Sequence, residues 1–239
     1  FLNSELKIHD IEDSSCNGLQ VENEVEIKKI GFAVDACLES MKKAKDASCQ
    51  MLITHHGMIW EGIKYIKGDT YKKVSFLIKN DLALYAAHLP LDRHEEHGNN
   101  IKLADMLRLR NIGPFGFHNG KPIGFIGETN TTLEEIKNKL TENNLRTDCF
   151  CHGNNEIKKI AIISGNGKGE VYQAVLAGAD LYLTGEKNYK YHNLAKENNF
   201  NVICAGHYAT ETLGVKALML LLKEKFNVEV EFIDNPVEM

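Results

Sequence analysis

The sequence has no stretch that approaches the roughly 20 consecutive apolar residues of a membrane-spanning helix. Residues 1–13 also lack the charged and then apolar pattern of a secretory signal peptide, and the first residue is not methionine. We therefore expect a protein without a membrane segment.

A surplus of positive charge is absent as well. Lysine and arginine together number 28, against 33 aspartate and glutamate residues, which gives a formal net charge of -5. Because phosphate binding relies on lysine and arginine to release counterions, the charge balance argues against nucleic acid as a default partner. Hydrophobic residues at 43% and a length of 239 residues are typical of a globular protein of one large or two modest domains.

Cysteine pairs with the two-residue gap of a zinc ribbon are also missing. Cys149, Cys151 and His152 form the cluster CFCH, but no second pair follows it. The remaining cysteines are scattered along the chain, and two of the six lie in strand-like runs, where a free thiol behaves as a small apolar group. We therefore expect no structural disulfide and a cytoplasmic location.

Apolar runs of strand length alternate with helix-like stretches along most of the chain. Strands are expected near 28–34, 50–54, 82–87, 159–164, 180–184 and 201–205. Helices are expected near 36–47, 71–80, 98–109, 170–179, 188–199 and 210–225. This alternation predicts an α/β fold of parallel βαβ units, whose functional loops lie at the carboxyl ends of the strands.

An internal repeat sharpens this prediction. Residues 28–34 and 52–54 return as 158–164 and 182–184, an offset of 130 residues. The runs that end at His88 and His207 match at an offset of 119, so the first half should hold 11 extra residues before Asn80. The alternative is that any two βαβ units look alike at this level of detail.

Residues 112–155, between the two halves, differ in character. They open with several glycines and continue as a charged helical run over 132–145. We expect two similar βαβ-type halves around a metal site, at 1–111 and 156–239, with a small inserted α+β module at 112–155. Both halves would form one metal-binding domain.

Three of the strand-like runs end in residue types that bind metals. His55 and His56 follow the second run, and Gly57 permits the chain to leave the strand so that both imidazoles reach one cluster. Asp92 follows the third run, and His207 and Glu211 lie four residues apart, one helical turn, after the last.

Each of these three segments alone has an ordinary explanation. One of the two adjacent histidines can be packed in the core and the other solvated. An aspartate after a strand is often a turn or cap residue, and a pair four residues apart on a helix is often a simple side-chain contact. Together they offer three imidazoles and two carboxylates, ligands that suit zinc, manganese, iron or nickel and exceed what one structural zinc needs. We therefore expect two divalent transition-metal ions per chain, with Glu211 as a bridge.

The same segments resemble the NIF-three-like family, also called type 2 GTP cyclohydrolase I. The chain has Thr54-His55-His56, then Ala87-His88-Leu89-Pro90-Leu91-Asp92 followed by Gly98-Asn99, and finally Gly206-His207-Tyr208-Ala209-Thr210-Glu211. Residues 17–21 (NGLQV) also match the family's early signature, so the resemblance covers nearly the whole chain. Ser15 and Cys16 depart from the family, where an acidic residue and asparagine are usual, and Gly57 replaces a common proline.

By this resemblance, the metal ligands would be His55, His56, Asp92, His207 and Glu211. The assembly would be a toroidal homohexamer with the sites facing an internal cavity. The third imidazole of the motif, His88, would act as a group that orients a ligand or relays protons, with a packed core histidine as the alternative.

Two functions follow from these features. The first is a dinuclear-metal-dependent hydrolase, GTP cyclohydrolase-like by resemblance, that acts on a nucleotide-like or phosphorylated small molecule. The alternative is a non-catalytic metal-binding scaffold or regulatory protein with a protein, DNA or metal partner.

Several smaller features allow more than one interpretation. The loop 164–169 (SGNGKG) follows a strand, either as a phosphate-binding loop or as a plain turn. The second half has no counterpart of the His55–His56 pair. Residues 189–192, which follow the equivalent position, would line a substrate pocket. His94 and His97 are expected to be solvated, whereas Trp60 would cover the metal site or pack at a subunit contact.

Overall fold

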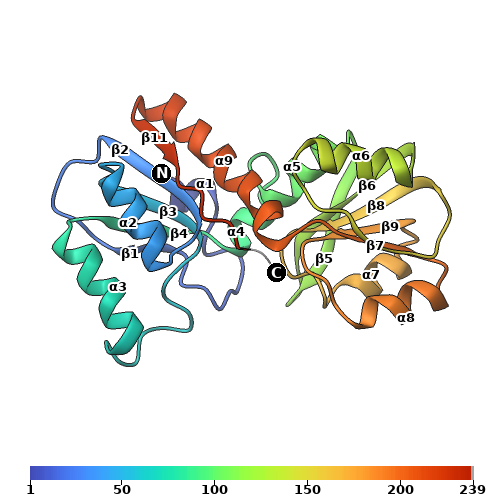
Figure 1. Cartoon of the computed structure of the whole chain (residues 1–239), viewed down its shortest axis with the longest axis horizontal. Helices are drawn as coiled ribbons and strands as arrows, with labels where there is room; N and C mark the ends of the chain where they lie inside the picture. The colour runs from blue at the N-terminus through green and yellow to red at the C-terminus, as the bar shows by residue number, and fades with distance from the viewer. Residues whose placement is uncertain (238–239) are drawn as a thin grey trace. The chain divides into compact units, whose positions relative to one another are not determined.

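The computed structural model describes residues 1–237, and the chain divides into two compact units (Figure 1). The first unit comprises Phe1–Leu91 and Gly214–Pro236, and the second comprises Asp92–Leu213. Helix α9 (His207–Phe226) therefore begins in the second unit and ends in the first. The three-part division at residues 111 and 155 stays a prediction about how the chain is organised.

The first unit is built on a five-stranded sheet of strand order β1-β4-β3-β2-β11. Its strands are β1 (Gly18–Val21), β2 (Lys29–Asp35), β3 (Met51–His56), β4 (Ala83–Ala86) and β11 (Glu229–Phe232). Its helices are α1 (Leu2–Glu5), α2 (Leu38–Asp46), α3 (Gly68–Lys79) and the start of α4 (Leu89–Asp92). All neighbouring strands are parallel except β1, which pairs antiparallel with β4.

The alternation of side chains along these strands gives the sheet two apolar faces. On one face, Phe32 and Ile53 pack with Leu218 of α9. On the other, Leu52 packs with Met41 of α2 and Leu77 of α3. A parallel sheet needs such cover on both faces, which explains why its strands are continuous apolar runs in the sequence.

The second unit is built on a six-stranded sheet of strand order β5-β6-β8-β9-β10-β7. Its strands are β5 (Arg110–His118), β6 (Lys121–Thr132), β7 (Asp148–Cys151), β8 (Glu156–Ile163), β9 (Leu181–Thr184) and β10 (Asn201–Cys204). Its helices are α5 (Asn99–Met106), α6 (Leu133–Glu142), α7 (Val171–Leu176) and α8 (Lys190–Glu197). Residues 112–155 thus supply most of the β5–β6 hairpin, helix α6 and strand β7, and all three strands join this sheet.

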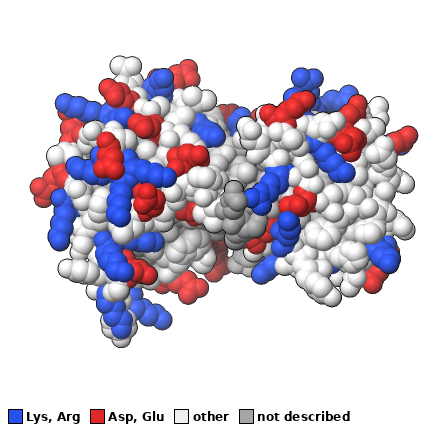
Figure 2. All heavy atoms as spheres, viewed as in Figure 1, with Lys and Arg blue, Asp and Glu red and all other residues white. Residues whose placement is uncertain are grey.

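Charged residues of both signs are interspersed over the face of each unit that Figure 2 shows. Blue lysine and arginine spheres alternate with red aspartate and glutamate spheres there.

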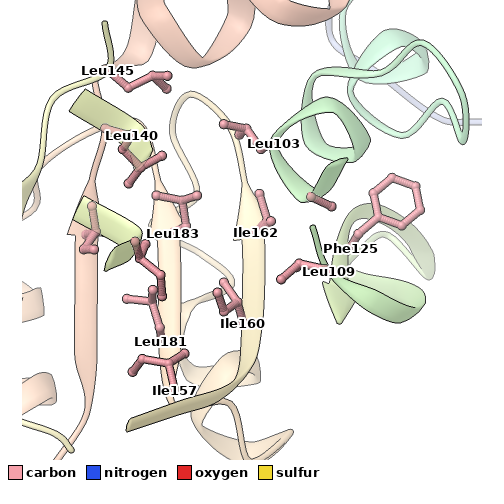
Figure 3. Packing of buried hydrophobic residues seen from close by; sticks show 14 of the residues in the cluster. Leu103, Leu109, Phe125, Leu140, Leu145, Ile157, Ile160, Ile162, Leu181 and Leu183 are labelled. Atoms are coloured by element: carbon pink, nitrogen blue, oxygen red, sulfur yellow. The ribbon is translucent and has the colours of Figure 1, made fainter. Parts of the chain in front are cut away.

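One face of the second sheet packs against α5 and α6 around a large apolar cluster. Figure 3 shows Ile160 and Ile162 of β8 beside Leu181 and Leu183 of β9, facing Leu103 of α5. Helix α6 begins with a capping box, in which the Thr132 side chain and the Glu135 side chain each accept a backbone N–H of the other residue. This packing makes β8, β9 and β10 a rigid platform for the loops at their carboxyl ends.

The strand ladders confirm the α/β class and two similar halves, and they correct one offset. Ile30 pairs with Met51 as Ile160 pairs with Leu181, which gives the expected offset of 130 residues. However, Met51 pairs with Ala83 and Leu181 with Asn201, so the third strand repeats at an offset of 118. The expected 119 is wrong because it aligned His88 with His207 by residue type, whereas hydrogen bonding fixes the register.

Cys149 and Cys151 lie two residues apart on β7 with their sulfur atoms in contact, and the expectation of no structural disulfide stays a prediction. Both side chains lie on the face of β7 that packs against the apolar cluster, two residues apart on one strand. The cytoplasmic location stays a prediction. Among the helices of residues 1–237, none combines the length and the apolar character needed to cross a bilayer.

Candidate metal centre

His55 and His56 lie at the carboxyl end of β3, in the first unit. His55 is fully buried, and its Nδ1 lies 2.9 Å from the carbonyl oxygen of Ala87. The Nδ1 of His56 lies 2.8 Å from the Asp35 carboxylate. The parallel register places Asp35 of β2 directly opposite His56, so strand pairing itself brings the acid to the imidazole.

His88 follows β4 and lies beside the other two imidazoles. Its ring centroid is 5.1 Å from that of His55 and 5.6 Å from that of His56. Its Nδ1 lies 2.9 Å from the buried carboxylate of Asp13, and its backbone N–H donates to the Asn17 side chain over 2.7 Å. Asn17 also donates to Asp13, so the N-terminal loop holds both the ring and its partner.

Ring nitrogens of His55, His56 and His88 lie within 4.8 Å of one another, and we call these three residues the imidazole cluster. A carbonyl or carboxylate oxygen only accepts hydrogen bonds, so each Nδ1 must carry the hydrogen in these contacts. In the neutral ring, Nε2 then holds the lone pair. The structure therefore fixes the tautomer that metal binding through Nε2 requires.

Asp13 is a carboxylate held in its charged form. Burial acts to raise its pKa, but the hydrogen bond and charge of His88, with donors from Asn17 and Ser15, outweigh burial and lower the pKa to about 2. Asp13 thus stays charged at neutral pH and keeps His88 oriented. Ser15 and Cys16 lie in the same loop, and the backbone N–H of Ser15 donates to Asp13.

The indole of Trp60 lies over the imidazole cluster. Its ring is edge-on to His88 at 5.0 Å between centroids and 6.2 Å from His56. The indole N–H donates to the carbonyl of Gly57 over 2.9 Å, which fixes the ring. Of the two roles expected for Trp60, this position favours a cover over the imidazoles.

His207 and Glu211 lie in the second unit, at the start of α9. The Nε2 of His207 lies 3.0 Å from the Glu211 carboxylate, one helical turn away. Its Nδ1 lies 2.6 Å from the carboxylate of Glu186, which follows β9. Burial lowers the pKa of His207, but these two carboxylates together raise it to about 9, so the ring holds a proton that a metal ion would displace.

Asp92 is the second carboxylate of this unit, and its Oδ1 is held by two donors. The Asn99 amide donates to this oxygen over 2.9 Å, and the Ser164 hydroxyl donates over 3.0 Å. Asp92 is only 7% exposed, so these donors replace hydrogen bonds that its carboxylate would otherwise make to water. We call Asp92, His207 and Glu211 the carboxylate set.

Sequence reasoning missed the residues that orient these side chains. Asp35 is the last residue of the apolar strand β2, which pairs with β3. Because functional residues often lie at the carboxyl ends of parallel strands, its position could have marked it as a candidate. Glu186 occupies the position of the second half that is equivalent to His56, and this equivalence could have predicted a role for it. Asp13 lies in an irregular segment, and no pattern marks it.

His94 and His97 differ from the expected solvated residues. Both are half-buried, with rings stacked at 5.2 Å. The Nδ1 of His94 accepts the backbone N–H groups of Glu96 and His97 and thereby stabilises the turn.

The chain is similar to known proteins along its whole length. The family profile Duf34/NIF3 (NGG1p interacting factor 3) matches residues 1–237. The chain belongs to this family. A relative from Pyrococcus abyssi, named GTP cyclohydrolase 1 type 2 homolog, is 44% identical over 242 residues, covering 99% of this chain and 96% of the relative. A relative of the same name from Archaeoglobus fulgidus is 41% identical and covers 100% of this chain and 97% of its own length.

Solved structures of this Duf34/NIF3 chain's relatives show the same fold. The protein TTHA1606 from Thermus thermophilus has a TM-score of 0.92 and 34% identity, with 100% of this chain and 96% of that chain covered. Reduced HcgD from Methanocaldococcus jannaschii has a TM-score of 0.86 and 28% identity, with 98% and 95% covered. The suspected resemblance and the fold class are therefore confirmed.

Proposed function

We propose that this Duf34/NIF3 protein is a dinuclear-metal-dependent hydrolase that acts on a nucleotide-like or phosphorylated small molecule. The proposed ligands are His55, His56, Asp92, His207 and Glu211, and two divalent ions of zinc, manganese, iron or nickel are proposed per chain. Nitrogen and oxygen donors of this kind suit those metals. The name of the relatives, GTP cyclohydrolase 1 type 2 homolog, makes GTP the first substrate to test.

The observation that carries the proposal is shared by four imidazoles. His55, His56, His88 and His207 each have Nδ1 against an oxygen, at 2.6 to 2.9 Å. In three of the four the partner is a carboxylate. Metal-ligating histidines almost always donate their other ring N–H to such an oxygen, which orients the ring and leaves Nε2 for a metal. These four contacts support the proposed metal centre.

The residues of the chain divide the proposed work. Bound metal ions would supply a nucleophile by lowering the pKa of water, and they would orient a substrate oxygen. His88 would hold or move a proton at Nε2, since Asp13 fixes its other nitrogen. The exposed ring of Tyr189 is available to a substrate base, whereas Tyr191 is buried and packs against Phe150.

Elemental analysis of untagged protein tests the metal half of the proposal, and turnover tests the other half. We expect about two metal atoms per chain after purification without chelator, and hydrolysis of GTP or another nucleotide by protein loaded with zinc, manganese or iron. Metal content near zero after reloading would refute the metal centre. Full metal content without turnover across nucleotides and phosphorylated metabolites would refute the hydrolase.

The second candidate is a non-catalytic metal-binding scaffold or regulatory protein. It is favoured by the family description, which names an interacting factor of NGG1p rather than an enzyme. The mixed charges on the displayed face weigh against DNA as its partner (Figure 2). Metal-loaded protein that lacks turnover would support this candidate.

We further propose that the protein is a homo-oligomer, a hexamer by family resemblance. Several large apolar side chains of the segment after β3 are exposed: Ile63, Tyr65, Ile66 and Tyr71. Exposed groups of this kind often mark protein contacts. Light scattering should give a mass several times 26.9 kDa, and a clean monomer would contradict the proposal.

A further inference from the structure

In the loop between β8 and α7, residues 164–169, three backbone amides donate to side chains of their own unit. The N–H of Ser164 donates to Asn100 over 2.6 Å, that of Gly165 to Thr210 over 3.0 Å, and that of Gly167 to Thr184 over 3.2 Å. An amide that already donates cannot cradle a phosphate. The plain turn is therefore the better of the two interpretations of SGNGKG, and the loop needs another explanation.

Ser164 connects this loop to Asp92. Its hydroxyl donates to Asp92 Oδ1 over 3.0 Å, while the Asn100 amide that accepts the Ser164 N–H also donates to the Asp92 carbonyl over 3.2 Å. Ser164 is 5% exposed, so neither bond competes with bulk water. The side chain and the backbone of Asp92 are thus both fixed through residue 164 and its partner.

Gly165 connects the same loop to Glu211 and His207. Its φ is +56°, and a Cβ at this position would collide with Glu211 Oε1 and lie 3.2 Å from His207 Nε2. The Gly165 carbonyl also accepts the N–H groups of Gly185 and Glu186, over 3.0 and 2.9 Å. Glu186 in turn orients His207. The backbone of Gly165 therefore lies against the Glu211 side chain. Through Glu186 it also affects the orientation of His207.

Buried strand residues hold the loop in place from behind. The Tyr182 hydroxyl donates to the Gly167 carbonyl over 2.6 Å, and Tyr182 and Thr184 are both fully buried on β9. A hydrogen bond in such an environment costs free energy to break, because the freed groups have no water to bond. The sheet thus holds the loop in one position, and the loop in turn restricts the side chains of Asp92 and Glu211.

We propose that Ser164 and Gly165 are positioning residues that set the geometry of Asp92 and Glu211 for metal binding. The inference rests on the proposed metal centre. Ser164 orients one carboxylate through its hydroxyl, and Gly165 admits the other by having no side chain. Positioning of this kind typically changes metal affinity about 10-fold to 100-fold.

Matched variants test the two residues. Gly165→Ala introduces strain from the positive φ and a clash with Glu211, whereas Gly178→Ala introduces the same strain, at φ +67°, into open space in the same unit. Ser164→Ala removes a buried hydroxyl beside Asp92, whereas Ser40→Ala removes a buried hydroxyl on α2 of the first unit. The readouts are the Kd for Mn²⁺ by calorimetry, the Mn²⁺ paramagnetic resonance spectrum, and the thermal midpoint of metal-free protein.

We expect Gly165→Ala and Ser164→Ala to raise the Kd for Mn²⁺ by about 10-fold or more and to change the spectrum, while both controls bind as wild type. Ser164→Ala should do so with a metal-free thermal midpoint close to that of Ser40→Ala. Affinity equal to that of the matched control in both variants would overturn the positioning role. If Gly165→Ala does not fold, the result for Ser164→Ala decides. Wild type that binds no metal would overturn this inference together with the metal centre, whereas bound metal with unaffected variants would overturn this inference alone.

Discussion

The carboxyl ends of the two central sheets carry different chemistry on the same scaffold. Strands β2, β3 and β4 repeat as β8, β9 and β10 with the same order and directions. Yet β3 ends in His55 and His56, whereas β9 is followed by Gly185 and Glu186 at the same offset of 130 residues. The first unit presents three imidazoles, two of them oriented by acids, and the second presents carboxylates with one imidazole.

A steric reason explains why the histidine pair occurs once. A Cβ at residue 185 would lie 2.7 Å from the carbonyl oxygen of Gly165, so the second unit has no room for the counterpart of His55. At the position equivalent to Gly165, the first unit has Asp35, whose carboxylate orients His56. The positions that hold Asp35 and His55 in the first unit thus hold two glycines with closely approaching backbones in the second.

The largest expected effect comes from removing the carboxylate proposed to bridge two ions. Glu211→Gln keeps the size but removes the charge that offsets two divalent ions, so occupancy of both should fall, whereas Asp92→Asn should empty mainly one. Each ion contributes about 2.7 kcal/mol to the free energy of unfolding at a metal concentration roughly 100 times its Kd, and Glu211→Gln should lose both contributions. Elemental analysis and chemical denaturation measure both effects.

Glu197→Gln is the control, because Glu197 lies on the exposed surface at the end of α8. It removes one carboxylate charge from the second unit without touching the carboxylate set. Full two-metal occupancy in Glu211→Gln would show that the bridging assignment is wrong.

The next largest effect distinguishes a metal ligand, His55, from a proton carrier, His88, within the imidazole cluster. His55→Ala should lower metal content by about one atom per chain, whereas His88→Ala should keep the metal and lower kcat by roughly 100-fold, the lower end of general acid-base contributions. The exposed His9 supplies the control, His9→Ala. Metal loss in His88→Ala equal to that in His55→Ala would make His88 a third imidazole ligand.

A smaller effect compares the acids that orient the imidazoles. Asp35→Asn in the first unit and Glu186→Gln in the second leave the proposed ligands in place but weaken the hydrogen bond to Nδ1. Each should weaken metal affinity about 10-fold to 100-fold, less than the loss of a ligand. Competition with a chelating dye gives the Kd values. If a variant binds metal as tightly as wild type, the replaced acid does not orient a metal ligand.

The smallest effect is a pH dependence confined to the carboxylate set of metal-free protein. Its two carboxylate neighbours raise the pKa of His207 from 6.5 to about 9, so the charged ring stabilises the fold fully below pH 6.5 and loses this contribution as pH rises through about 9. His207→Gln lacks the titrating group. Wild type should therefore lose stability relative to this variant between pH 6.5 and about 9, in urea titrations with chelator. Parallel curves would contradict the assignment.

The sequence predicted well those parts of the protein that depend on local pattern. The six apolar runs became β2, β3, β4, β8, β9 and β10, because buried parallel strands must be continuously apolar. The glycine-rich stretch after residue 112 was harder, since it forms the β5–β6 hairpin. Gly124 is needed there because a Cβ would collide with the carbonyl oxygen of Ile162 on β8, a tertiary contact that no local pattern shows.

The proposed ligands also followed from their place after strands, but their partners did not. The Ser164 hydroxyl reaches Asp92 across 72 positions of sequence, and Asp13 reaches His88 across 75. Such contacts depend on how the loops fold back on the sheet, and a serine or an aspartate in a loop looks the same whether or not it makes one.

The discontinuity of the first unit has a consequence for the order in which the protein matures on the ribosome. Val215, Leu218 and Leu222 cover one face of its sheet, and β11 completes the edge beside β2. These residues are synthesised after all of Asp92–Leu213, so that unit can complete its core while the earlier one still exposes an apolar face. During synthesis of residues 92–213, the sheet of the first unit therefore lacks β11, the strand that pairs with β2.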